Sequence, residues 1–415
     1  MTTTTVSADA KYNGNESSYV LEYLDSENLS NKRQPWVGRF EAKFREVMGV
    51  QYAIAHNSGT STLHSCLEAA DVGFGDEVIM PAQTVAMLAF VTIAQNAIPV
   101  FADLDPDTFN LSAAEVKRLI TPQTKAIIAV HMHGAPADMD PIIEVAREHG
   151  ITLIEDCAQS LLATYKGKLA GTMGDLASFS FETKKHVSTG EGGMVTTNDE
   201  RLGTAVRKFG GLGYKTLKAG AGLRALLPEE FQNPHYKRHD THGLNYRMPD
   251  LCGALGLAQL ERVDFLVKRR QQVAQYFLEA LDQCSWIVPQ RVLPGCQSTY
   301  WTFTVKYDGL EARGVSWEQF YKAYKANGGD GFYGGLSVTY MEPFMQNKTF
   351  LRRRLPAEHP AFKGKFEYPV GLCPVAESVQ PRMMQFKTNY RNLETAKRQA
   401  GILKNTILQF QESRS

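Results

Sequence analysis

The chain has 415 residues, of which 43% are hydrophobic and 21% charged. This composition is typical of a globular protein with more than one domain and excludes disordered and fibrous classes. Basic residues number 45 and acidic residues 44, so there is no global charge to attract nucleic acid or an anionic membrane. The six cysteines occur singly, and no CxxC pair suggests a zinc or redox motif. We therefore expect the protein in a reduced compartment.

The sequence also indicates a soluble, cytoplasmic protein. Its stretch MTTTTVSADAKYNGNESS lacks the basic start and the apolar segment of a secretory signal. The longest apolar stretches, such as AIIAVHMHGA, are much shorter than the roughly 20 residues that cross a bilayer. We therefore expect neither a membrane nor a nucleic acid as a partner.

Strand-like and helical patterns alternate from about residue 50. The β-rich runs are, in chain order, 52–58, 76–81, 98–104, 125–133, 151–156, 177–181 and 192–199. Segments with apolar residues at helical spacing, such as TSTLHSCLEAA and MDPIIEVAREHG, stand between them. This alternation predicts βαβ crossovers and an α/β fold with a mostly parallel sheet flanked by helices. In such sheets, ligands bind at the carboxyl ends of the strands.

The pattern changes after residue 199. We expect the segment 207–238 to be loop-like and basic, because its Arg and Lys residues outnumber its Asp and Glu residues by seven to two. Such a loop is by default a solvated surface, and the alternative is a site for a diphosphate or a sugar-acid carboxylate. The apolar stripe along residues 249–281 predicts one long helix, which is long enough to link two domains. The remainder, from about Trp286, predicts a smaller α+β domain with a strand at 298–307.

Two carboxylates end the run 151–156, and strand alternation places Glu155 and Asp156 on opposite faces of the sheet. A carboxylate buried at a strand end requires a cation or a hydrogen-bond donor. One such partner for Asp156 is the ring nitrogen of a pyridine cofactor, which the carboxylate keeps protonated. The alternative is an Asp that caps the next turn, the more common role of an isolated Asp.

Adjacent lysines follow the run 177–181, in FSFETKKHVSTGEGG. A lysine at a strand end forms a Schiff base with an aldehyde when burial or a nearby cation lowers its pKa. Two lysines on a turn are, taken alone, more often a solvated surface feature. Because Asp156 and Lys185 are expected at neighbouring strand ends, we favour a reactive amine.

The stretch NSGTST, residues 57–62, lies between a predicted strand and a predicted helix. Its small residues let backbone N–H groups approach an anion, and the helix N-terminus adds a partial positive charge. We therefore expect a phosphate there. Taken alone the motif is weak, because SGT turns are common and lack the lysine of a P-loop.

Together these stretches resemble the DegT/DnrJ/EryC1/StrS sugar aminotransferase family of fold type I pyridoxal-phosphate enzymes. The resemblance extends from about Trp36 to Pro374 and includes, in order, NSGTSTL, GDEVIMP, DMDPI, EDCAQS, FSFETKKHVSTGEGG and GLNYRMPDLCGALGLAQL. It implies an aspartate aminotransferase-like fold with a seven-stranded sheet. We expect an N-terminal arm (1–35), a large cofactor-binding domain (36–265) and a small C-terminal domain (266–415).

The resemblance implies that pyridoxal 5′-phosphate is the cofactor and that Lys185, rather than Lys184, is its Schiff-base lysine. It assigns cofactor contacts to Asp156 at the ring nitrogen, Gln159 at the ring hydroxyl, Gly59, Thr60 and Ser180 at the phosphate, and Asn245 from a second subunit. A homodimer with shared active sites follows, and no metal is expected. Val85, in PAQTVAM, departs from the family pattern, in which an aromatic residue stacks on the cofactor ring.

Three functions are compatible with this site. The first is a pyridoxal-phosphate-dependent transaminase that moves an amino group from glutamate or glutamine to a keto-sugar, with Lys185 as general base and acid. Its acceptor is nucleotide-linked or a free keto-sugar acid, for example 8-oxo-3-deoxy-octulosonate giving 8-amino-3,8-dideoxy-octulosonate for lipopolysaccharide. The second is a sugar dehydratase, in which relatives carry His in place of the lysine, whereas here His186 only follows it. The third is a non-catalytic regulator, which has no need of a reactive amine.

Overall fold

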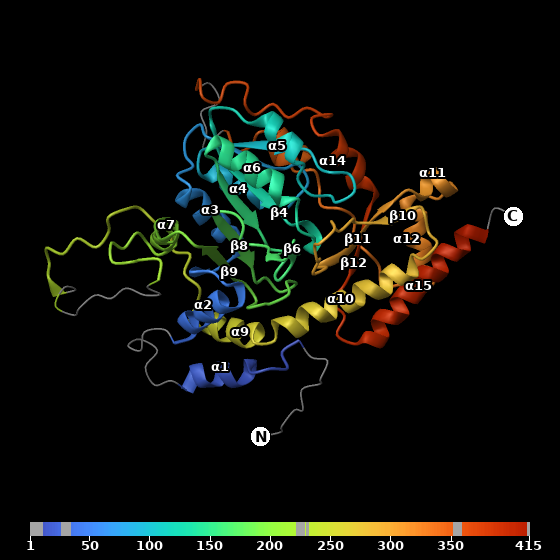
Figure 1. Ribbon diagram of the computed structural model, residues 1–415, viewed down its shortest axis with the longest axis horizontal. Helices are drawn as coiled ribbons and strands as arrows, with labels where there is room; N and C mark the ends of the chain where they lie inside the picture. The colour runs from blue at the N-terminus through green and yellow to red at the C-terminus, as the bar shows by residue number, and fades with distance from the viewer. Residues whose placement is uncertain (1–10, 26–34, 221–228, 230–231, 352–358, 413–415) are drawn as a thin grey trace.

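The computed structural model describes residues 11–25, 35–220, 229, 232–351 and 359–412. A large sheet lies at its centre (Figure 1). This sheet has seven strands in the order β1-β9-β8-β5-β4-β2-β3. The strands from β8 to β3 are parallel, whereas β9 runs antiparallel to both of its neighbours. This mostly parallel sheet, with helices on both faces, confirms the predicted α/β fold.

The seven strands match the seven runs predicted from the sequence. They are β1 (Tyr52–His56), β2 (Glu77–Pro81), β3 (Ile98–Ala102), β4 (Thr124–Val130), β5 (Thr152–Asp156), β8 (Leu176–Ser180) and β9 (Gly193–Thr197). Two smaller sheets contain β6 (Thr164–Tyr165) with β7 (Lys168–Leu169), and β10 (Ile287–Pro289) with β11 (Thr302–Tyr307) and β12 (Met383–Lys387). The strand expected at 298–307 is therefore confirmed as β11.

Helices cover the sheets and connect them. They are α1 (Glu16–Asp25), α2 (Pro35–Met48), α3 (Gly59–Ala69), α4 (Met87–Ala94), α5 (Ala113–Leu119), α6 (Met139–His149), α7 (Glu200–Gly210), α9 (Asp250–Leu260), α10 (Val263–Ala280), α11 (Gly309–Arg313), α12 (Trp317–Ala326), α13 (Pro343–Gln346), α14 (Pro374–Val379) and α15 (Leu393–Glu412).

Alternation along each strand divides the apolar side chains between the two faces of the large sheet. On β5, Ile154 packs with α3, α4 and α7, while Leu153 packs with α5 and α6 on the other face. On β9, Val195 joins the first core, and Met194 packs with α2 and α9. Neighbouring residues thus enter different cores, as a side-chain period of two requires. The polar residues that follow the parallel strands meet at one edge of the sheet.

Helix α10 joins this assembly to a separate C-terminal core. Its first half contributes Val263 and Val267 to the core with α2 and α9. Its second half contributes Val273 and Phe277 to the core around β10, β11 and β12. Figure 1 shows α10 running from α9 towards α15. The single helix predicted over 249–281 is instead two helices, because Arg262 leaves the helical region with φ −113° and ψ 10°.

Packing in the C-terminal part does not follow the order of the chain. Tyr340 and Phe366 belong to the core with α3 and α4, although the predicted boundary assigns 266–415 to a small domain. The separate core instead combines α10, α12 and α15 with the three-stranded sheet. The predicted domain boundaries stay a prediction, and the chain crosses between the two cores more than once.

The segment 207–238 is only partly the basic loop that the sequence predicted. Arg207 and Lys208 belong to α7, and Arg224 lies outside the described residues. The Arg207 guanidinium forms a buried two-point ion pair with Glu41, with Nη1–Oε1 and Nη2–Oε2 distances of 3.0 and 2.9 Å. This ion pair therefore links α7 to α2 beside β1, and the cation is not available to a substrate.

We expect Arg207→Met to lower the free energy of unfolding by about 3–5 kcal/mol, since it leaves the Glu41 carboxylate buried without its cation. Lys208→Met on the same helix is the matched control. It removes a partly exposed ion pair with Asp240 and costs at most about 1 kcal/mol. Urea unfolding followed by circular dichroism measures both variants. Equal losses would contradict the interpretation of a buried pair.

Candidate active site

The candidate site lies at the carboxyl ends of β5 and β8. These strands pair in parallel, with Asp156 opposite Ser178, and Lys185 follows β8 in the loop that leads to β9. Lys185 and Asp156 are close enough to act on each other's pKa. Among the described residues, the Asp156 carboxylate accepts one hydrogen bond, from the Ala158 N–H to Oδ1 at 2.9 Å. Its Oδ2 is therefore available to a ligand.

Burial changes the acid–base chemistry of both groups. It raises the pKa of Asp156, and the Ala158 N–H and the Lys185 charge offset part of this increase. Burial lowers the pKa of Lys185, the Arg270 charge lowers it further, and Asp156 and Glu182 act in the opposite direction. A lower pKa increases the fraction of neutral amine at a given pH, and the neutral amine is the form that acts as nucleophile or base.

The two adjacent lysines occupy different environments. The Lys184 side chain is exposed, whereas the Lys185 Nζ lies 4.5 Å from the centre of the Trp301 ring. The next residue, His186, is buried with its Nε2 3.0 Å from the Thr299 carbonyl oxygen. Burial lowers the pKa of His186 well below the ordinary histidine value, so this ring is neutral and held in place by the backbone. Of the three side chains, Lys185 is the one placed for chemistry with Asp156.

The predicted phosphate site is at the start of α3. Ser58 caps this helix, since its Oγ accepts from the Ser61 N–H (3.1 Å) and the Ser61 Oγ accepts from the Ser58 N–H (3.2 Å). The N–H groups of Gly59 and Thr60 in the first turn have no acceptor within the helix. Gly59 packs so closely on Ser180 that a Cβ at position 59 would lie 2.7 Å from the Ser180 Cβ. The structure thus brings the three predicted phosphate residues together.

Gln159 is held by a residue that the sequence did not suggest. Its Oε1 accepts from the His133 N–H at 2.8 Å, so its NH₂ group remains as a donor for a ligand oxygen. His133 has φ 60° and ψ 7°, a left-handed conformation that is uncommon outside glycine and occurs at functional sites. The sole sequence signal for His133 is its position at the end of the predicted strand 125–133.

Two positions that the sequence analysis singled out, Val85 and Asn245, have other neighbours within the single chain. Val85 is half-buried against the core with α3 and α4, and the aromatic ring beside the Lys185 amine belongs to Trp301 instead. Asn245 is exposed, and its Oδ1 accepts from the Arg247 Nε at 3.0 Å. The contact expected between Asn245 and the phosphate of a second copy is not tested by a single chain and stays a prediction.

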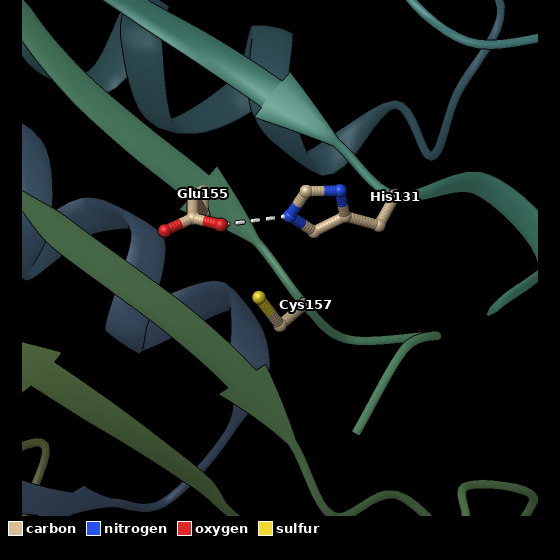
Figure 2. Close-up of side chains that lie close together, drawn as sticks. All are labelled: His131, Glu155 and Cys157. Atoms are coloured by element: carbon tan, nitrogen blue, oxygen red, sulfur yellow. Dashed lines mark hydrogen bonds and ion pairs between the residues drawn. The ribbon is translucent and has the colours of Figure 1, made fainter. Parts of the chain in front are cut away.

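A second polar cluster lies beside the candidate site, on the opposite face of β5 from Asp156. Figure 2 shows the His131 imidazole pointing at the Glu155 carboxylate, with the Cys157 thiol nearby. Their ligand atoms all lie within 4.8 Å of one another, a spacing that also suits a metal ion. Burial raises the pKa of Cys157 well above the ordinary thiol value, which opposes the thiolate that metals prefer.

Hydrogen bonds already occupy the other two groups. His131 Nδ1 accepts from the Ala137 N–H (3.0 Å), so Nε2 carries the proton and donates to Glu155 (3.0 Å). Glu155 also accepts N–H bonds of 2.7 to 2.8 Å from Gly171, Met173 and Gly174. Burial alone would raise the pKa of Glu155, but these bonds outweigh it and lower the pKa. We interpret the cluster as a hydrogen-bonded support for the loop after β7.

We expect Glu155→Gln to destabilise the fold by about 3 kcal/mol or more, because an amide cannot accept all four bonds. Glu148→Gln, an exposed change on α6, is the control. Since the folded-state pKa of Glu155 is lowered, its contribution is present above the ordinary Glu value of about 4.3 and is lost as the pH falls through the folded-state pKa. Thermal midpoints should therefore differ most at neutral pH and converge in acid. Equal midpoints at pH 7, or a cobalt(II)–thiolate absorption band, would contradict this interpretation.

Comparison with known proteins identifies the family. A model of the DegT/DnrJ/EryC1/StrS aminotransferase family matches residues 11–399. The GDP-perosamine synthase of Caulobacter vibrioides is 42% identical over 301 residues, which cover 72% of this chain and 76% of that protein. The GDP-perosamine synthase of Escherichia coli O157:H7 is 37% identical over 300 residues, with coverages of 72% and 77%.

A solved structure agrees with these matches. The aminotransferase from Psychrobacter cryohalolentis superposes with a TM-score of 0.81 at 28% identity, over 96% of this chain and 97% of its own. The matches confirm the predicted family, the fold type I architecture and the pyridoxal-phosphate cofactor. The chain belongs to the DegT/DnrJ/EryC1/StrS aminotransferase family and is a pyridoxal-phosphate-dependent sugar transaminase.

Proposed function

We propose that this transaminase moves an amino group from glutamate or glutamine to a nucleotide-linked keto-sugar, and that the nucleotide is GDP. The observation that carries the proposal is the 42% and 37% identity to two proteins named GDP-perosamine synthase. Such a product requires a GDP-linked keto-sugar as its precursor. The free keto-octulosonate acid that the sequence left open becomes a comparison substrate.

The residues at the strand ends fit pyridoxal phosphate. The buried Asp156 offers Oδ2 to a ring N–H, and Gln159 offers its NH₂ to the ring oxygen. The first turn of α3 and Ser180 suit the phosphate, because a side chain at Gly59 would obstruct their close approach. When bound, the cofactor supplies an aldehyde for Lys185 and an electron-withdrawing ring.

Lys185 is the proposed carrier of the proton. Its neutral amine removes a proton from Cα of the amino donor, and its ammonium form returns a proton to the carbon of the acceptor that receives nitrogen. Burial lowers the pKa of Lys185 and so favours the first step. The Asp156 carboxylate stabilises the ammonium form that the second step needs. The opposing influences of burial and Asp156 suit a group that must both take and give a proton.

The two alternative functions have less support. A dehydratase of this family would carry His in place of the lysine, whereas His186 is buried and bonded to the Thr299 carbonyl. A regulator without catalysis would not need a half-buried amine whose charge interacts with that of a buried carboxylate. Both arguments rest on the presence of Lys185.

We also propose that the active unit is a homodimer in the cytoplasm. The dimer would allow Asn245 to reach the phosphate of a second copy, and the exposed apolar side chains of Leu244 and Leu251 near it favour a contact surface.

Among the described residues, no helix combines the length and apolarity needed to cross a membrane. Lys215 and Lys218 are exposed, and we interpret them as a solvated surface.

An amino-transfer assay tests the acceptor. Purified protein loaded with pyridoxal phosphate is incubated with glutamate, or with glutamine, and a GDP-linked 4-keto-6-deoxyhexose, a dTDP-linked analogue or 8-oxo-3-deoxy-octulosonate. We expect the GDP-sugar to give the highest kcat/KM, with 2-oxoglutarate or 2-oxoglutaramate and an amino-sugar as products in equal amounts. Turnover with the free keto-acid alone would contradict the proposal, and loss of a sugar hydroxyl without amination would favour the dehydratase.

Substitution of each lysine tests the choice between them. We expect Lys185→Ala to lower kcat by at least about 10³-fold, since it removes the general acid and base. Lys184→Ala removes an exposed side chain and should change kcat by less than about threefold. Circular dichroism spectra of the two variants serve as the folding control. Comparable activity in both variants would overturn the assignment of Lys185.

A further inference from the structure

Arg270 lies where the two cores of the molecule meet. It is on α10 between Val267, which packs with α2 and α9, and Val273, which packs around the three-stranded sheet. Only 7% of its surface is exposed, which is unusual for an arginine. A charged side chain buried at a junction must be held by several acceptors, because its desolvation is costly.

The acceptors of Arg270 belong to both sides of the junction. On one side, Nη2 donates to the carbonyl oxygens of Lys184 (2.8 Å) and Lys185 (3.2 Å). On the other side, Nη1 donates to the Trp301 carbonyl oxygen (2.8 Å) and to the Thr388 Oγ1 (3.1 Å). The guanidinium therefore connects the backbone of the lysine loop directly to the ends of β11 and β12.

The segment just before β11 strengthens this connection. The Trp301 Nε1 donates to the Lys184 carbonyl oxygen (3.2 Å), and the Thr388 Oγ1 donates to the Tyr300 and Trp301 carbonyl oxygens at 2.6 and 2.9 Å. The His186 Nε2 is bonded to the Thr299 carbonyl oxygen on the other flank of Lys185. Both backbone neighbours of Lys185 are thus fixed to the C-terminal core.

The charge of Arg270 has a second effect. Burial lowers the pKa of Arg270 to about 10, so it remains a cation at neutral pH. Its hydrogen bonds go to carbonyls and a hydroxyl, and among the described residues no carboxylate neutralises it. The charged groups that act on the Lys185 amine are Asp156 from β5, Glu182 from its own loop and Arg270 from α10, while His186 is neutral.

We propose that Arg270 is a positioning residue for the transaminase, which fixes the backbone of Lys185 against the C-terminal core and keeps a positive charge beside its amine. This rests on the proposed role of Lys185. Arg270 does not touch the reacting atoms in this arrangement. It determines where the amine can be and favours its neutral form.

The test is the pH dependence of Lys185 in the full-length protein. In the holoenzyme, the visible absorption of the bound cofactor is titrated with pH. After removal of the cofactor, dinitrophenylation of Lys185 with fluorodinitrobenzene is followed by peptide mass spectrometry. A pocket of about 90 Å³ lined by Lys185, Arg270 and Thr388, among others, borders the junction.

Three variants separate charge from geometry. Arg270→Gln removes the charge, and we expect both pH midpoints to rise by about one pH unit. Arg270→Lys keeps the charge but loses the planar fork, so the midpoints should move by less than half as much while kcat falls by about tenfold or more. Thr388→Val removes one anchor and should lower kcat by a few-fold at unchanged KM. Lys268→Gln, an exposed change on α10, is the control and should match the wild type.

Unchanged midpoints in folded Arg270→Gln would overturn the proposal. If this variant does not fold, wild-type kinetics and midpoints in both Arg270→Lys and Thr388→Val would overturn it instead. Failure of the proposed function itself would give a different result. In that case Lys185 of the wild type would react no faster with fluorodinitrobenzene than the exposed Lys184. The two failures are therefore distinguishable in one series of labelling experiments.

Discussion

The parallel pairing of β5 with β8 is the constraint on which the site depends. It sets Asp156 opposite Ser178 and delivers the loop with Lys185 to the same edge of the sheet. Either group alone would be costly to bury in its charged form. Their opposite charges reduce that cost for each other, since each charge offsets part of the effect of burial on the other group's pKa. A shift of one residue in the register would turn Asp156 to the other face and separate the pair.

Strand alternation also explains why two adjacent carboxylates on β5 have different roles. Glu155 faces His131 and three backbone amides, and its acceptor capacity is used by four donors. Asp156, on the other face, accepts a single hydrogen bond from the described residues. The pKa of Glu155 is lowered and that of Asp156 is raised, although both are buried. The difference lies in the number of donors, and it leaves only Asp156 with capacity to bind a ligand.

Local sequence patterns predicted the features that depend on residues close together in the chain. The seven strands, the start of α3 and the neighbouring positions of Asp156 and Lys185 follow from periodicity and from the order of the elements. Contacts between distant segments could not be predicted in this way. We predicted Arg207 to be part of a basic loop, because the residues near it in the sequence give no sign of its ion pair with Glu41, far earlier in the chain. The local sequence VKRRQQ is likewise typical of a helix surface. It does not predict the burial of Arg270, because the acceptors of Arg270 belong to three other segments.

The same long-range contacts imply that the site is not a property of the large sheet alone. The cofactor contacts predicted for Asp156 and Gln159 lie at the edge of that sheet, while the backbone of Lys185 is fixed to Trp301 and Thr388 through Arg270. Moving the C-terminal core would therefore move the amine relative to the carboxylate. Because α10 is continuous across the junction and contributes apolar side chains to both cores, such a movement costs packing on both sides. A rigid connecting helix with a buried arginine at its midpoint is thus a physical means to hold the amine at a fixed position relative to the carboxylate while the chain binds its sugar acceptor.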